Sequence, residues 1–137
     1  YGIKNFAKVG AIILTIVNRR YCKKLLIQVA GQFHPLHCHK IKEETFQVLW
    51  GELTIFIAGQ YNILYPGDQL TILPGQLHSF TTRTGVIVEE ISSTHHKDDS
   101  FYQDAKISKV LESRKTRLKD GIMSFEQYNF FPSNTLE

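Results

Sequence analysis

The most informative segment of the sequence is GQFHPLHCHKIKEETFQVLWG, at residues 31–51. Residues i and i+2 of an extended chain face the same side, so His37 and His39 can direct two imidazoles into one cavity. Glu44 can add a carboxylate oxygen, and His78, which follows a Pro-Gly turn further along the chain, can add a third imidazole. Three neutral imidazoles and one carboxylate suit a divalent metal, and zinc, manganese, iron and nickel all accept such donors. The pattern therefore predicts a metal centre, with ordinary surface histidines as the alternative.

Short strands separated by turn residues run from residue 11 to about residue 91. β-branched and aliphatic runs come first, and apolar residues then alternate with polar ones between Gly and Pro turns. About eight such strands, spaced roughly ten residues apart, indicate an all-β sandwich or barrel. The expected strands cover Ala11–Val17, Lys24–Ala30, Phe46–Trp50, Leu53–Ile57, Tyr61–Tyr65, Leu70–Ile72, His78–Thr82 and Val86–Ile91.

The spacing of the residues around the histidine pair resembles the cupins. Gly31, His37, His39, Glu44 and Gly51 reproduce the first motif of that family in full. The resemblance implies an all-β cupin barrel, also called a double-stranded β-helix or jelly roll, made of two packed antiparallel sheets. It also implies a metal inside the barrel mouth, with the ligands His37, His39, Glu44 and His78.

The second cupin motif runs from Gly67 through Gly75 to His78, and it departs from the family pattern at two positions. Leu73 stands where the family has proline, and Thr82 stands where it has asparagine. Neither departure removes a metal ligand, so the expected ligand set is complete.

A finer resemblance concerns residues 34–51 and 89–94. They are similar to the cupin module attached to the C-terminal side of bacterial N-acetylneuraminate (sialic acid) synthase-like proteins, and to the cupin-type sugar isomerases that act on lyxose-like sugars. Asp98–Tyr102 and Arg114-Lys115 are more similar to the synthase-attached module. This resemblance implies a metal-binding cupin domain with a sugar-binding or regulatory role, a sugar or sugar derivative as ligand, and an N-terminal synthase domain as partner.

Two other functions remain open, because the cupin fold hosts many chemistries. The first alternative is a metal-dependent aldose–ketose isomerase, in which a glutamate moves a proton between adjacent sugar carbons. Glu89 and Glu90 are the candidates, since they interrupt a strand of otherwise apolar residues; an ion pair with Lys40, Lys42 or Arg83 is an equally open role. The second alternative is an iron dioxygenase, which needs the same ligands and has no distinguishing residue here.

Several other side chains carry weaker expectations. His34 and Lys42 are candidate substrate contacts, and His34 is expected in a loop at the rim, where a plain surface role is its alternative. Cys22 and Cys38 are expected to be packed thiols. The aromatic residues expected to fill the core, one of which could line a sugar site instead, are Phe46, Trp50, Phe56 and Tyr61.

Composition excludes several classes of protein. The chain has 137 residues, 42% apolar and 21% charged, which indicates one ordered domain. Sixteen Lys and Arg against thirteen Asp and Glu leave a net charge of +3, too small an excess to suggest a nucleic-acid partner. The longest apolar runs are too short to cross a membrane. Two cysteines cannot build a disulfide framework, so we expect a reducing, cytoplasmic location.

The pattern also suggests boundaries and an assembly. We expect residues 1–92 to form the barrel and residues 93–137 to form a C-terminal extension packed on it, irregular or with a short helix near residues 107–111. A start without Met and an end at Leu136-Glu137 suggest a piece of a longer polypeptide. A homodimer formed through an edge strand, supplied by Tyr1–Val17, is also expected.

Overall fold

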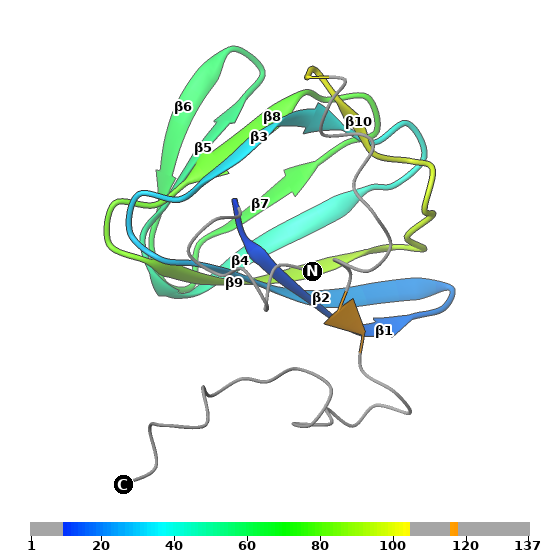
Figure 1. Ribbon diagram of the computed structural model, residues 1–137, viewed down its shortest axis with the longest axis horizontal. Coiled ribbons are helices and arrows are strands. Elements are labelled where there is room, and N and C mark those ends of the chain that lie inside the picture. The colour runs from blue at the N-terminus through cyan, green and yellow to red at the C-terminus, as the bar shows by residue number, and fades with distance from the viewer. Residues whose placement is uncertain (1–9, 105–115, 118–137) are drawn as a thin grey trace, which may run out of the picture.

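The computed structural model describes residues 10–104 and 116–117, which form two β-sheets that face each other (Figure 1). The six-stranded sheet has the order β11-β1-β2-β9-β4-β7, and the five-stranded sheet has the order β10-β3-β8-β5-β6. Neighbouring strands run antiparallel, except for β1 and β11, which are parallel. The strands are β1 (Ile12–Asn18), β2 (Tyr21–Gln28), β3 (Phe33–Cys38), β4 (Glu44–Gly51), β5 (Leu53–Ile57), β6 (Gln60–Leu64), β7 (Gln69–Ile72), β8 (His78–Thr81), β9 (Val86–Ser93), β10 (Phe101–Tyr102) and β11 (Thr116–Arg117).

The two sheets confirm the expected all-β fold. The described residues contain no helix, and therefore none long and apolar enough to cross a membrane. Every expected strand is present, with its ends shifted by up to three residues. The strands β3, β10 and β11 were not expected as strands. The last two are only two residues long, and in β3 the apolar alternation is hidden by Pro35 and the histidines, while its pairing with β8 shifts register between His34 and His37.

Apolar side chains from both sheets fill the space between them. Val48, Val88 and Leu26 are neighbours across β4, β9 and β2, and each is at most 2% exposed. Ile55 on β5 and Phe80 on β8 belong to the same buried cluster. Each buried apolar side chain contributes roughly 1.5–3 kcal/mol relative to full exposure, so this layer supplies the main favourable term of folding.

The aromatic prediction is correct for Phe46, which is 2% exposed, and wrong for Trp50 and Tyr61. Trp50 is 59% exposed because the β4–β9 pairing shifts register between Val48 and Trp50. Tyr61 is 76% exposed on the edge strand β6, where its ring lies 4.9 Å from the half-buried ring of Phe56. Aromatic residues beside a register shift or on a sheet edge are therefore poor markers of this core.

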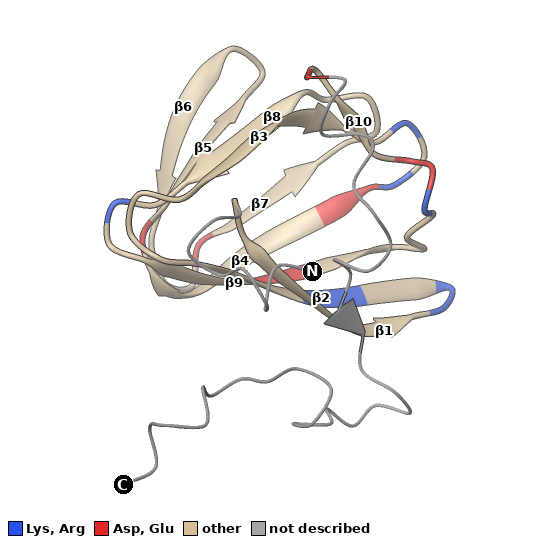
Figure 2. Cartoon of the chain, viewed as in Figure 1, with Lys and Arg blue, Asp and Glu red and all other residues tan. Residues whose placement is uncertain are grey.

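The interior between the sheets becomes polar toward one end. On the large sheet, Glu90 lies opposite Lys24 in the β2–β9 pair, and Glu44 is the first residue of β4. On the small sheet, His37 lies opposite His78 in the β3–β8 pair. Figure 2 shows the acidic positions on β4 and β9 and the basic positions on β2. This end of the barrel therefore gathers the side chains on which a functional site depends.

The strand arrangement also bears on the expected boundaries. The small sheet continues past residue 92, because β10 pairs with β3. On the large sheet, β11 pairs with Leu14 and Thr15 of β1, so β11 rather than β1 is the outermost strand there. The helix expected near residues 107–111 and the first nine residues lie outside the described residues.

Candidate metal centre

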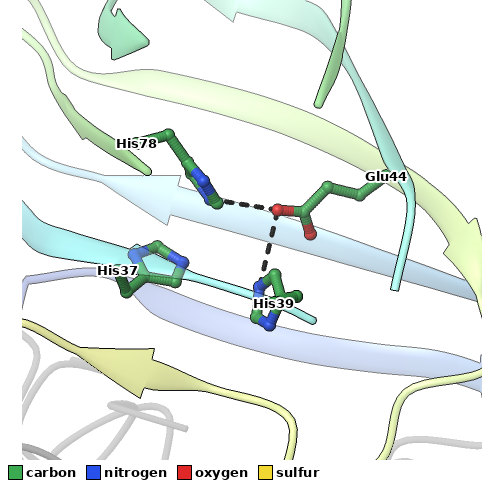
Figure 3. Close-up of side chains that lie close together, drawn as sticks. All are labelled: His37, His39, Glu44 and His78. Carbon is green, nitrogen blue, oxygen red and sulfur yellow. Dashed lines mark ion pairs between the residues drawn. The ribbon is translucent and has the colours of Figure 1, made fainter. Parts of the chain in front are cut away.

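The four predicted ligands converge at the polar end of the barrel. His37 lies near the end of β3 and His39 directly after it, while Glu44 and His78 begin β4 and β8. One ligand atom of each residue lies within 4.8 Å of the other three, and all four side chains are buried. Figure 3 shows the three imidazoles and the carboxylate grouped together between the sheets. This is the convergence that the sequence pattern requires.

Hydrogen bonds to the backbone fix the orientation of each imidazole. The Nδ1 atoms of His37, His39 and His78 lie 2.8, 2.6 and 3.0 Å from the carbonyl oxygens of Pro35, Asp99 and Gln76. A carbonyl oxygen only accepts, so each Nδ1 must carry the proton and donate. In the neutral ring the lone pair is then on Nε2, which is how metal-binding histidines are held in proteins.

The facing donor atoms fit a cation better than they fit each other. The Nε2 atom of His78 lies 3.0 Å from Oε1 of Glu44, and that of His39 lies 3.5 Å from the same oxygen. Yet Glu44 Oε1 and His78 Nε2 have no hydrogen-bond partner among the described residues. A buried polar atom without a partner costs about 1–3 kcal/mol, so lone pairs aimed at one point call for a positive ion between them. The donor set therefore passes the test of fit for a divalent metal.

The electrostatic surroundings favour neutral imidazoles and an ionised carboxylate. Burial lowers the pKa of His37 and of His39, which keeps both rings neutral. Burial by itself would raise the pKa of the Glu44 carboxyl, but the Lys42 ammonium in contact with it outweighs burial and holds that pKa below its usual range. Neutral imidazoles and an ionised carboxylate are the forms that bind metals.

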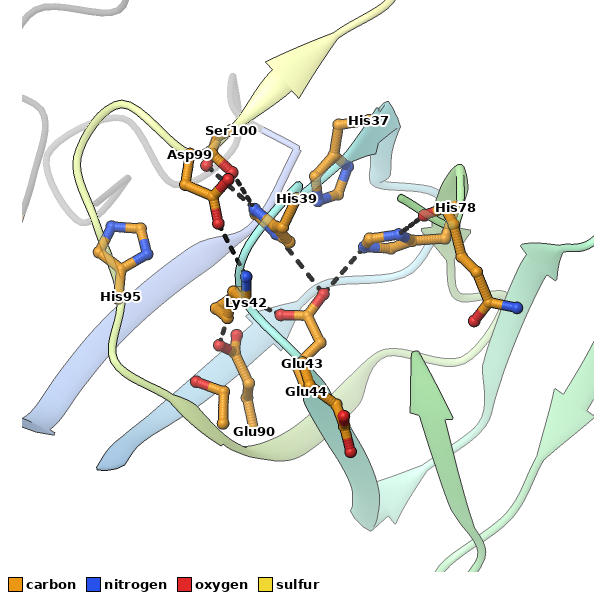
Figure 4. Close-up of polar contacts among 12 residues, drawn as sticks. His37, His39, Lys42, Glu43, Glu44, His78, Glu90, His95, Asp99 and Ser100 are labelled. Carbon is orange, nitrogen blue, oxygen red and sulfur yellow. Dashed lines mark hydrogen bonds and ion pairs between the residues drawn. The ribbon is translucent and has the colours of Figure 1, made fainter. Parts of the chain in front are cut away.

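A buried group of charges adjoins the four donors (Figure 4). The Nζ atom of Lys42 contacts Oε2 of Glu44 and lies 2.8 Å from Oε1 of Glu90. Lys24 Nζ lies 3.3 Å from the same oxygen of Glu90. Burial lowers the pKa of Lys42, but the charges of Glu90 and Glu44 raise it more, so this ammonium stays protonated. The expected pairing between a β9 glutamate and Lys42 is therefore present, and it lies beside the candidate metal ligands.

The two glutamates of β9 lie on opposite faces of the sheet. Glu90 is 3% exposed and belongs to the buried charges, whereas Glu89 faces outward and pairs with Lys23 at 2.7 Å. Strand alternation separates them, and only Glu90 neighbours the candidate metal centre.

His34 was expected in a loop at the rim. It lies instead in β3, and only 4% of its surface is exposed. Its ring stacks on Phe80 with centroids 4.7 Å apart and meets the edge of His37 at 4.8 Å. Burial lowers the pKa of His34 to about 3, so the ring is neutral. Tyr102 places its hydroxyl 3.3 Å from Nε2 of His34. His34 is thus an interior residue that supports the metal-ligand layer.

Three further residues of this region were not predicted from the sequence: Lys24, Asp99 and Tyr102. Lys24 could have been found, because it holds an inward position between Cys22 and Leu26 in an apolar strand. Asp99 and Tyr102 come from the polar segment after β9, and no local pattern marks them.

Known proteins resemble this chain both in sequence and in fold. No protein-family model matches the chain. A D-lyxose ketol-isomerase from Cohnella laeviribosi is 30% identical over 139 residues, covering 80% of this chain and 76% of that protein. The L-ribose isomerase of Cellulomonas parahominis, solved with L-ribose, superposes with a TM-score of 0.69 at 18% identity over 72% of each chain. The cupin domain of Cnp3 from Schizosaccharomyces pombe gives a TM-score of 0.55 at 14% identity, over 62% of this chain and 64% of that one. The barrel is thus a cupin, and by its sequence the chain belongs to the D-lyxose ketol-isomerase family.

Proposed function

We propose that this protein is a metal-dependent aldose–ketose isomerase that acts on a small sugar. The observation that carries the proposal is the set of lone pairs from His37, His39, Glu44 and His78 beside a second buried carboxylate, Glu90. A divalent cation held by these four residues would supply Lewis acidity to adjacent carbonyl and hydroxyl oxygens of an open-chain sugar. Zinc, manganese, iron and nickel all suit the donors, so the metal is chosen by experiment.

The isomerisation also needs a base that takes a proton from C2 of the aldose and returns it to C1. Glu90 is our candidate: its Oε1 accepts hydrogen bonds from Lys42 and Lys24, which leaves Oε2 to receive the proton. The exchange balances within the sugar, because C2 and its hydroxyl oxygen each lose a hydrogen while C1 and its oxygen each gain one, and no outside oxidant or reductant is required. Lys42 and His34 remain candidates for contact with the substrate.

We favour the isomerase over the sialic-acid-synthase module and the iron dioxygenase for two reasons. The D-lyxose ketol-isomerase reported above is 30% identical to this chain, and none of the three proteins reported above is named a sialic-acid synthase. An iron dioxygenase would use the same ligands, but it would leave the buried pair of Glu90 and Lys42 without a role in proton transfer.

The first experiment measures the metal content of the purified protein by elemental mass spectrometry, alongside a variant with His37→Ala and His39→Ala. We expect near-stoichiometric metal that the double variant loses. The metal-free protein is then reloaded with zinc, manganese, iron or nickel and assayed with D-lyxose, D-mannose and L-ribose. Absence of isomerisation under every combination would overturn the proposed function.

A matched pair of variants tests the base. Glu90→Gln should lower kcat by about 100- to 10,000-fold, the usual contribution of a positioned acid or base. Glu89→Gln changes the neighbouring residue in the same way but on the outer face of β9, so its kcat should stay near that of the wild type. Equal effects of the two substitutions would remove Glu90 from the mechanism.

A further inference from the structure

Asp99 binds the segment that joins two candidate metal ligands. Its carboxylate accepts hydrogen bonds from three consecutive backbone amides: that of Lys40 at 2.8 Å, that of Ile41 at 3.1 Å to each oxygen, and that of Lys42 at 2.9 Å. Asp99 is only 3% exposed, although it follows an exposed stretch of the chain. Residues 40–42 therefore turn around a carboxylate that comes from 57 to 59 residues away.

The same residue also holds a ligand directly. The carbonyl oxygen of Asp99 accepts the Nδ1 proton of His39 at 2.6 Å, and the hydroxyl of Ser100 lies 3.4 Å from that nitrogen. Figure 4 shows Asp99 and Ser100 on the side of His39 that faces away from Glu44. One residue thus sets the ring of His39 and the path of the chain that leads to Lys42.

We propose that Asp99 is a positioning residue that assembles the metal centre before a metal binds. The proposal rests on the proposed function in one respect, namely that a divalent cation occupies the site. Because residues 40 and 41 join His39 directly to Lys42, the course of this turn determines where the His39 ring and the Lys42 ammonium lie relative to Glu44. Mutation of a group that orients a metal ligand typically weakens metal binding by about 10- to 100-fold.

The chemistry of the turn requires a carboxylate at this place. Both oxygens of Asp99 accept, and together they satisfy all three amides. An asparagine amide offers one accepting oxygen and places an NH2 group against a backbone N–H, so at least one donor loses its partner. Burial raises the pKa of the Asp99 carboxyl, but the amides of Lys42, Lys40 and Ile41 outweigh it and hold the pKa below its ordinary value.

The test is the affinity of the full chain for Co²⁺, followed through the visible absorption of the bound ion, in metal-free wild type and three variants. Asp99→Asn should weaken binding by about 10- to 100-fold and alter the absorption spectrum. Asp98→Asn makes the same charge change at the exposed neighbouring residue. Asp68→Asn makes the same change in a carboxylate that accepts a hydrogen bond from the Tyr65 amide at 2.8 Å, in the turn between β6 and β7. Both controls should bind Co²⁺ as the wild type does.

The possible results distinguish a failure of the positioning role of Asp99 from a failure of the proposed function. If the wild type binds no Co²⁺, the metal site and the proposed function fail together. If the wild type binds and Asp99→Asn binds equally well, only the positioning role is overturned, even when its Tm falls as much as that of Asp68→Asn. Should Asp99→Asn not fold, Asp99→Glu moves the carboxylate outward by one methylene. Weaker Co²⁺ binding then supports the proposal, and unchanged binding overturns it.

Discussion

Removing the ammonium of Lys42 should destabilise the metal-free protein strongly. Its Nζ lies 2.8 Å from Oε1 of Glu90 and also contacts Glu44, and all three side chains are at most 4% exposed. At an effective dielectric constant of about 20, the attraction at 2.8 Å is about 6 kcal/mol before desolvation is subtracted. Breaking a buried ion pair by deleting one partner costs about 3–5 kcal/mol, because the remaining charge stays buried. We therefore expect Lys42→Met, which keeps most of the side chain, to lower the free energy of unfolding by that amount.

Urea unfolding of the metal-free protein, followed by circular dichroism, measures the loss. The matched control is Lys23→Met, because Lys23 precedes Lys24 on β2 and pairs with Glu89 at 2.7 Å on the outer face. That pair is 42% and 18% exposed, so solvent screens it and its removal should cost less than about 1 kcal/mol. Equal losses in the two variants would refute the argument that burial makes the Lys42 pair strong.

A double variant isolates the charge from the packing. In Lys42→Met combined with Glu90→Gln, the buried negative charge that lost its partner is itself removed. The double variant should therefore be less destabilised than the sum of the two single variants. Simple additivity would mean that the methylene stem of Lys42, and not its ammonium, accounts for the loss.

Three further predictions concern the backbone, the thiols and the metal. In thermal unfolding, Gly51→Ala should lower the Tm far more than Gly59→Ala. Both glycines have φ near +80°, but only at Gly51 would an added Cβ lie 2.0 Å from the carbonyl oxygen of Gly85. Equal losses of Tm would contradict this prediction. A thiol reagent should modify Cys38 in the native protein and spare Cys22, because Cys22 is fully buried and burial raises the pKa of its thiol. Cys38→Ser should abolish the reaction, and labelling that persists in this variant would contradict the prediction. A divalent cation at about 100 times its dissociation constant should raise the free energy of unfolding by about 2.7 kcal/mol, measured by urea unfolding with and without a chelator, and an unchanged midpoint would argue against binding to the folded state.

The candidate ligands could be predicted from the sequence because their geometry is largely local. His37 and His39 share a face of one extended segment, and Glu44 follows after a short turn. His78 enters from another strand, and it was predicted from its place after the Pro74-Gly75 turn and from the resemblance to the second cupin motif rather than from periodicity. The apolar strands were equally accessible, since Leu53–Ile57 alternates strictly between buried and half-buried residues.

The surroundings of the ligands could not be predicted in the same way. The position of Asp99 depends on hydrogen bonds that span nearly sixty residues, and its exposed neighbours give no sign that it is buried. His34 was misplaced because Pro35 and a register shift interrupt the strand that contains it. Trp50 was misplaced because hydrophobicity alone does not say on which side of a register shift a residue lies.

The balance of charges at the polar end of the barrel connects the fold to the proposed chemistry. Lys24 and Lys42 carry two positive charges, which Glu44 and Glu90 cancel, so the group tolerates burial without a metal. A divalent cation added beside three neutral imidazoles leaves a positive excess that no described side chain of this group offsets. The positive excess stabilises a bound neutral sugar only weakly. It stabilises the negative charge that develops on the sugar oxygens during proton transfer much more strongly. Because catalysis requires stronger binding of the transition state than of the substrate, this charge balance favours turnover over simple sugar binding.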